Sequence, residues 1–188
     1  MALARRLPAR KAAGLKSGAR RLQRDGRSRG VKFAVASLAS AGFVSQVQRQ
    51  VEAVPRGATG LWIELADGAA MQAARVAEAS AKWRRSGVRF GLQYAGTELR
   101  QLSNVHALGI DYIKVGGSVV QGIASVPALR DLTRGVVTLL RGRKQRVLVD
   151  AVQDDADIRA LRSLGFDGAT GPALRHAGLR RRDSGRLP

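Results

Sequence analysis

The sequence contains no cysteine, which removes disulfide bridges, thiolate metal sites and cysteine nucleophiles from consideration. Cysteine usage therefore leaves the redox compartment open, and the cytoplasm is the default expectation. Long apolar runs are also missing. The longest candidate, from Phe33 to Val44, is shorter than the roughly 18 residues that a membrane span requires, so no span is expected. With only eight aromatic residues, a base-stacking platform for nucleic acid is not supported.

Acidic residues are scarce: 14 Asp or Glu stand against 33 Lys or Arg, which gives a net charge of +19. Much of this charge lies in two arms. Residues 1–30 carry ten Lys or Arg and a single acid, Asp25, while residues 175–188 carry five Arg and a single acid, Asp183. Basic arms of this kind favour weak, non-specific binding to polyanions such as nucleic acid through counterion release. The competing interpretation is a solvated extension, disordered or helical, with no partner.

Residues 31–174 have the length and composition of one folded domain, in which short apolar runs alternate with amphipathic stretches. The runs predict parallel strands at Val31–Leu38, Leu61–Leu65, Val88–Leu92, Tyr112–Val115, Val147–Val149 and Phe166–Ala169. The amphipathic stretches predict helices at Gly42–Ala53, Ala69–Ser86, Glu98–Leu108, Pro127–Arg141 and Asp155–Leu164. This alternation is typical of an α/β fold with a parallel sheet, but periodicity does not choose between an open sheet and a barrel.

Single residues mark several of the predicted helix ends. Gly87, Gly109 and Gly165 each follow a predicted helix, at the position where a left-handed cap is common. Asp154 and Asp155 stand where a side chain caps the start of the last helix. Trp83 falls on the apolar side of its predicted helix and is interpreted as a core residue.

Four segments in order carry a resemblance to a known family. The segment from Gly91 to Gly116 is similar to a stretch that runs Asp-Asp-Phe-Gly-Thr-Gly, then a helix, then Asp-Tyr-Leu-Lys-Ile-Asp, with no gap. Trp62–Asp67 is similar to Leu-Glu-Ile-Thr-Glu, Val147–Gln153 to Val-Ile-Ala-Glu-Gly-Val-Glu, and Leu161–Gly171 to Leu-Arg-Glu-Leu-Gly-Cys-Asp-Tyr-Ala-Gln-Gly. Upstream, Phe33–Ser40 loosely resembles a strand that reads Ala-Val-Asn-Leu-Ser. Together these segments resemble the later part of an EAL domain, from the cyclic di-GMP phosphodiesterase family.

The resemblance implies a modified TIM barrel that hydrolyses cyclic di-GMP with two Mg²⁺ or Mn²⁺ ions, held by carboxylates at the carboxyl ends of the strands. Residues 1–30 take the place of the first strand–helix units and contain no Glu-Ala-Leu signature. We therefore expect a degenerate, N-terminally truncated EAL-like domain over residues 31–174, with a TIM-barrel-like (βα) repeat of about six strands in an incomplete barrel. Whether residue 1 is the natural start stays open.

The resemblance keeps two site positions: Glu64 matches a metal-ligand glutamate and Lys114 matches the active-site lysine. At the other site positions this chain has a different residue from the family. Gln93 and Tyr94 stand where the family has paired aspartates, and Gly116 stands where it has a third aspartate. Asp150 and Gln153 replace two glutamates, Thr170 replaces the late glutamine, and Ser37 replaces the early asparagine. Mg²⁺ needs charged oxygen ligands, which so few carboxylates cannot supply for two ions. We expect no intact catalytic set, no bound metal or other cofactor, and no phosphodiesterase activity.

Several functional interpretations follow from this loss. Glu64 and Lys114 end neighbouring predicted strands and are interpreted as an ion pair. Inactive relatives of the family can still bind cyclic di-GMP, so the leading interpretation is a remnant sensor or interaction module in cyclic di-GMP signalling. The alternative is an interaction protein that binds nucleic acid or an anionic surface through its basic arms.

An incomplete barrel exposes a strand edge and apolar helix faces, which makes a homodimer a further expectation. His106 and His176 have no second ligand at a useful spacing.

Overall fold

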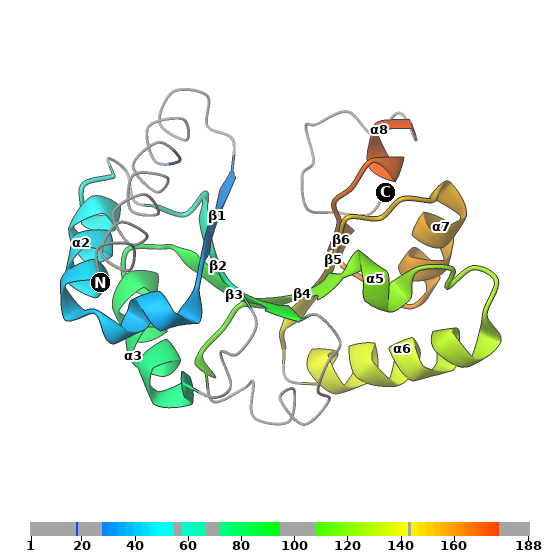
Figure 1. Cartoon of the computed structure of the whole chain (residues 1–188), viewed down its shortest axis with the longest axis horizontal. Coiled ribbons are helices and arrows are strands. Elements are labelled where there is room, and N and C mark those ends of the chain that lie inside the picture. Colours follow the sequence, from blue (N-terminus) through cyan, green and yellow to red (C-terminus); the bar gives the residue numbers. More distant parts are fainter. Residues whose placement is uncertain are drawn as a thin grey trace, which may run out of the picture. The chain divides into compact units, whose positions relative to one another are not determined.

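The computed structural model describes residues 18, 28–54, 58–66, 72–94, 108–142 and 144–176 of the chain (Figure 1). The chain divides into two compact units, the first made of residues 1–92 with 103–110 and the second of residues 93–102 with 111–188. In each unit, parallel strands follow one another in chain order and alternate with helices.

The first unit is built on three strands. They are β1 (Arg29–Phe33), β2 (Leu61–Leu65) and β3 (Arg89–Tyr94), and β2 pairs with both neighbours. The short 3₁₀ helix η1 (Val35–Ala39) and the α-helices α2 (Ala41–Glu52) and α3 (Ala73–Arg84) connect the strands. An aromatic cluster holds helices and sheet together: the ring of Phe33 lies 5.1 Å from that of Phe43 and 6.1 Å from that of Trp83, which lies 5.7 Å from Phe90. All four side chains are buried, which confirms Trp83 as a core residue.

The second unit repeats the arrangement with β4 (Tyr112–Gly116), β5 (Arg146–Asp150) and the two-residue β6 (Gly168–Ala169). Its helices are α5 (Gly117–Val120), α6 (Pro127–Arg141), α7 (Asp155–Ser163) and α8 (Ala173–His176). The middle strand β5 reads Val147-Leu148-Val149 in its buried part, as expected of a parallel strand covered on both faces.

The predicted elements agree with this structure except at a few ends. The strand predicted at Val31–Leu38 is wrong beyond Phe33, because the chain turns into η1 through a backbone hydrogen bond from Ser37 to Ala34. Val35 and Leu38 are buried three residues apart, a spacing that suits a helical turn as well as an apolar run. The strand predicted at Phe166–Ala169 is shorter and begins at Gly168. The helix predicted at Glu98–Leu108 lies, apart from its last residue, outside the described residues.

The predicted end signals are confirmed where their helices are described; the helix predicted before Gly109 lies outside the described residues. Gly87, Gly109 and Gly165 have φ angles of 86°, 62° and 90°, the left-handed conformation in which a side chain is strained. The carboxylate of Asp154 accepts the backbone N–H of Ala156 and so caps α7. Both kinds of cap act locally, which is why the sequence reveals them.

Within the basic N-terminal arm, Gly18 is helical and buried. An ideal Cβ at this residue would lie 3.3 Å from Cγ2 of Val31 and 3.7 Å from Cδ1 of Leu61, so the backbone at Gly18 packs directly on β1 and β2. The rest of the arm up to residue 27, and the basic tail from residue 177, lie outside the described residues. Among the described residues, no helix is long and apolar enough to cross a membrane.

Candidate functional site

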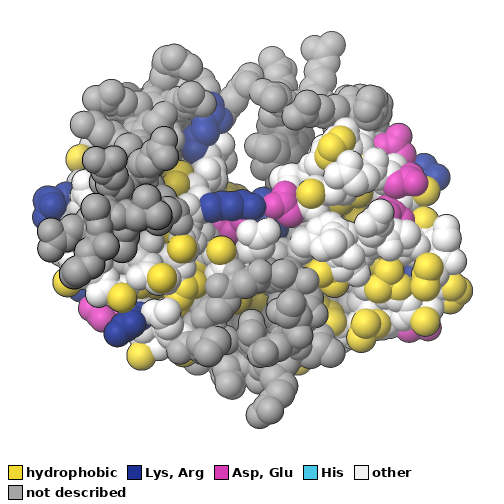
Figure 2. All heavy atoms as spheres, viewed as in Figure 1, with side chains coloured by type: hydrophobic (Ala, Val, Ile, Leu, Met, Phe, Trp, Pro, Cys, Tyr) yellow, Lys and Arg dark blue, Asp and Glu magenta, His cyan; other side chains and the backbone are white. Residues whose placement is uncertain are grey.

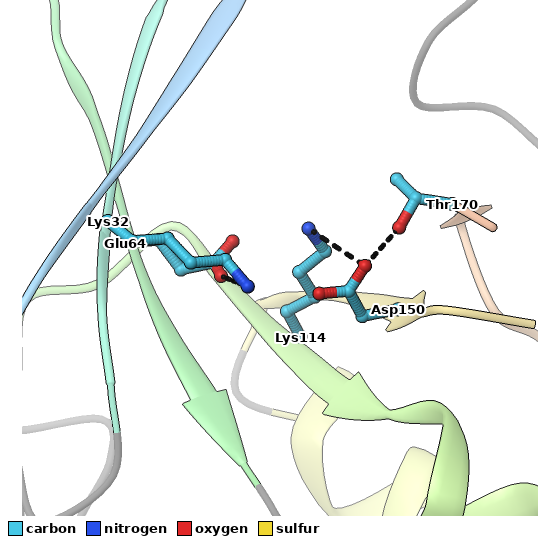
Figure 3. A network of polar contacts seen from close by, with 5 residues as sticks. All are labelled: Lys32, Glu64, Lys114, Asp150 and Thr170. Atoms are coloured by element: carbon cyan, nitrogen blue, oxygen red, sulfur yellow. Dashed lines mark hydrogen bonds and ion pairs between the residues drawn. The ribbon is translucent and has the colours of Figure 1, made fainter. Parts of the chain in front are cut away.

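In the first unit, the retained Glu64 lies beside a lysine of the neighbouring strand. Lys32 on β1 is paired in register with Glu64 on β2, so the two side chains leave the sheet side by side. The Nζ atom of Lys32 lies 3.3 Å from Oε1 of Glu64 (Figure 3). The Glu64 side chain is only 6% exposed, whereas that of Lys32 is 51% exposed. The pair therefore joins a buried carboxylate to an ammonium that water reaches.

In the second unit, three positions of the expected site meet around one carboxylate. Nζ of Lys114, on β4, lies 3.6 Å from Oδ1 of Asp150, the last residue of β5. The hydroxyl of Thr170, directly after β6, donates a hydrogen bond to the same oxygen (Figure 3). The side chains of Lys114 and Asp150 are both mostly buried. The Lys114 ammonium and the Thr170 hydroxyl thus both approach one oxygen of the Asp150 carboxylate.

The backbone around Asp150 is held at close range by two glycines. A Cβ at Gly117 would stand 2.5 Å from the carbonyl oxygen of Asp150, and a Cβ at Gly171 would stand 2.3 Å from the backbone nitrogen and oxygen of Val152. Backbone hydrogen bonds of 2.9 Å join Thr170 to Val149 and to Val152. The close approach of these segments fixes the Thr170 hydroxyl over Asp150.

The remaining expected site positions occupy strand ends or loops. Gln93 is half-buried near the end of β3, and Gly116 is the last residue of β4, opposite Asp150 in the register. Gln153 is exposed, and its amide donates to the carbonyl of Ala151 at 3.1 Å. Ser37 lies in η1 and not on a strand, so its assignment to the early strand is wrong. The side chains of Tyr94 and His176, and the whole of His106, lie outside the described residues.

Sequence reasoning missed Lys32 as a site residue. It placed Glu64 and Lys114 at the ends of neighbouring strands, which is wrong, because β2, which carries Glu64, pairs with β1 and β3. The structure shows a lysine partner for Glu64 and an aspartate partner for Lys114. Lys32 and Glu64 are 32 residues apart, and only the pairing register of β1 on β2 brings them together. The available signal was that Lys32 is the one charged residue of the predicted strand Val31–Leu38.

Comparison with known proteins defines the class of protein. A family model described as the EAL domain matches residues 11–177, and the chain belongs to this family. No curated protein matches the chain in a sequence search. The resemblance to the EAL family seen in the sequence is thereby confirmed.

Solved structures give the fold. An EAL domain protein from Listeria monocytogenes EGD-e is similar with a TM-score of 0.77 at 18% identity, over 85% of this chain and 65% of that one. The EAL domain of Mycobacterium smegmatis DcpA is similar with a TM-score of 0.79 at 18% identity, over 96% of this chain and 87% of that one. The Xanthomonas citri FimX EAL domain, solved in complex with c-diGMP, has a TM-score of 0.80 at 14% identity, over 91% and 71% of the two chains. These likenesses confirm the incomplete TIM-barrel-like (βα) repeat of about six strands.

Proposed function

We propose that this chain is a non-catalytic member of the EAL family that acts as a sensor or interaction module in cyclic di-GMP signalling. The observation that carries the proposal is the pairing of both site carboxylates with lysines: Glu64 with Lys32 and Asp150 with Lys114. Two-metal hydrolysis needs several carboxylates that are free to bridge divalent ions. An ammonium beside each acid competes for the same oxygen atoms and repels an incoming cation.

The residues at the substituted site positions are poor ligands for divalent metal ions. Gln93 is neutral, Gly116 has no side chain, and the Thr170 hydroxyl already donates to Asp150. Mg²⁺ and Mn²⁺ prefer charged oxygen ligands in near-octahedral geometry. We therefore derive no metal-assisted step for this chain.

Ligand binding without turnover is supported by two considerations. The EAL domain structures of FimX from Xanthomonas citri and from Pseudomonas aeruginosa, which share this fold, contain cyclic di-GMP. By its sequence motif, Lys114 matches the active-site lysine of the family, and it lies on β4. A lysine ammonium is a point charge that suits a phosphate oxygen, provided that the ligand displaces Asp150 from it.

The test has two readouts. The purified protein, incubated with cyclic di-GMP and Mg²⁺ or Mn²⁺, is expected to yield no linear dinucleotide above a blank without protein, measured by chromatography. Calorimetry without metal is expected to show binding of cyclic di-GMP that weakens at least tenfold in Lys114→Ala. The matched control is Lys82→Ala, which removes an exposed lysine paired with Glu78 on α3. Turnover would refute the loss of catalysis, and equal affinities for the two variants would refute the role of Lys114.

A further inference from the structure

We propose that Lys32 acts as a tethered cation at Glu64, supplying the positive charge that a divalent ion supplies to the corresponding glutamate of an EAL phosphodiesterase. This inference deepens the proposed function and relies on its premise that the chain does not use metal chemistry. It concerns only the first unit, in which Lys32 and Glu64 lie on adjacent paired strands.

The burial of Glu64 demands a cation. A carboxylate whose side chain is 6% exposed has lost most of its hydration, and such a charge is tolerated only when it is paired. The Lys32 ammonium lies 3.3 Å from Oε1, within ion-pair distance. Because half of the lysine side chain stays in solvent, its own desolvation cost is small.

The observed register also revises the alignment of the early strand. The family pattern Ala-Val-Asn-Leu-Ser places an asparagine on a strand, and β1 ends at Phe33, so Ser37 cannot be its counterpart. Val31-Lys32-Phe33-Ala34 fits Val-Asn-Leu-Ser without a gap and places Lys32 at the asparagine position. The register then sets this position directly beside Glu64.

An asparagine and a lysine at this position have opposite effects on metal binding beside Glu64. An asparagine carbonyl oxygen is an acceptor and a ligand for hard cations. A lysine ammonium has three donors and no acceptor, so it cannot ligate a metal and instead takes the place of one beside the carboxylate. A single substitution at this position both removes a ligand and neutralises the acid that remains.

The experiment asks whether an added cation can replace the lysine. Four variants are compared by thermal unfolding with and without Mn²⁺ alone as the probe: Lys32→Met, Lys32→Asn, and each of these combined with Glu64→Gln. Lys32→Met is expected to lower Tm by roughly 5 °C or more, since it leaves a buried carboxylate without this partner. Adding Glu64→Gln is expected to recover most of that loss, because the buried charge is then gone.

Millimolar Mn²⁺ is expected to raise the Tm of Lys32→Met and Lys32→Asn by several degrees, more for Asn because it adds an oxygen ligand. Wild type and both variants with Glu64→Gln are expected to show no such shift. Lys82→Met is the matched control, because Lys82 pairs with an exposed glutamate, and it is expected to change neither Tm nor the response to Mn²⁺.

The proposal is overturned if Lys32→Met leaves Tm unchanged, or if Mn²⁺ stabilises wild type as much as the Lys32 variants. It is also overturned if Mn²⁺ stabilises neither Lys32→Met nor Lys32→Asn. None of these readouts involves cyclic di-GMP, so a failure here is distinguishable from detected turnover, which would instead refute the proposed function.

Discussion

Oδ2 of Asp157, on α7, accepts the backbone N–H of Gly122 at 3.0 Å, although the two residues are 35 positions apart. The other carboxylate oxygen accepts the N–H of Ala124 at 3.0 Å, and Arg130 donates to the carbonyls of Ile123 and Ala124. In the turn between α5 and α6, the Asp157 carboxylate thus binds backbone N–H groups, and the Arg130 guanidinium binds backbone carbonyls. Asp157 is buried, so this contact is protected from water.

Replacing Asp157 by asparagine is expected to destabilise the fold. The amide would present an N–H₂ group to one of the two backbone N–H donors, which leaves a buried donor unsatisfied and costs about 1–3 kcal/mol. The free energy of unfolding from urea titration measures the loss. Asp155→Asn is the control, because it removes an exposed first-turn charge of the same helix without touching the turn. Equal losses in the two variants would show that only the helix dipole is involved.

Replacing Ala151 by glycine is expected to stabilise the protein or leave it unchanged. Ala151 has a φ of 57°, a conformation that costs a residue with a Cβ about 1–2 kcal/mol, and its family counterpart is the glycine of Glu-Gly-Val. The extra entropy of glycine in the unfolded chain offsets part of the gain, so the expected net change is between zero and about 1 kcal/mol. Thermal and urea unfolding measure it.

The control for this prediction is Ala160→Gly, in the middle of α7 of the same unit. There glycine is expected to cost about 1 kcal/mol, since the helical φ suits alanine better. Destabilisation of similar size in both variants would mean that the positive φ of Ala151 carries no strain.

Self-association through α6 is expected to be weak and dependent on concentration. The exposed large hydrophobic side chains of the described residues are Val126, next to α6, and Leu132 and Leu139 on it, the latter two 56% and 46% exposed. Figure 2 shows hydrophobic side chains at the surface in the region of α6. Gly135 and Val136 lie midway between the two leucines. In an antiparallel pair of α6 helices centred there, Leu132 of each copy would therefore contact Leu139 of the other. No charged residue interrupts this stripe from Leu132 through Gly135 and Val136 to Leu139.

Sedimentation velocity over a concentration series checks this expectation. Leu132→Lys with Leu139→Lys is expected to leave only monomer at concentrations where wild type is partly dimeric. Ser125→Lys with Thr138→Lys adds the same charge at exposed polar positions and is expected to keep the wild-type behaviour. A wild type that is monomeric at every concentration would contradict the prediction.

Binding to polyanions is expected to be weak and strongly dependent on salt. The ten Lys and Arg of residues 1–30 release counterions when they neutralise phosphates, so log affinity is expected to fall with log salt at a slope near −0.9 per contact. The measurement is a salt series on two unrelated DNA duplexes. Changing Arg5, Arg6, Arg10 and Lys11 to glutamine is expected to flatten the slope by about three to four.

The matched control replaces four exposed arginines of the folded units, Arg49, Arg85, Arg159 and Arg162, by glutamine. It removes the same charge and is expected to change the slope much less. An equal effect of the two sets, or a clear preference for one duplex, would move the interaction from the arm to the folded part of the chain.

The features that could be predicted from the amino-acid sequence are those that depend on near neighbours along the chain. Pro127–Arg141 was predicted to its bounds because its apolar spacing, starting proline and following glycine act within one helix. The cap glycines and the Asp154 cap are equally local. The motif order from Trp62 to Gly171 indicated the EAL family and its (βα) repeat.

Which distant side chains meet could not be predicted, because it depends on how the strands and helices pack. Whether Lys32 or a later residue faces Glu64 depends on the register of β1 on β2, and a shift of one residue would turn every side chain of the strand to the other face. The Thr170 hydroxyl reaches Asp150 because Gly117 and Gly171 let three backbone segments approach more closely than any Cβ would allow. Local propensity carries no information about such pairings, because they arise from packing between elements that are far apart in the chain.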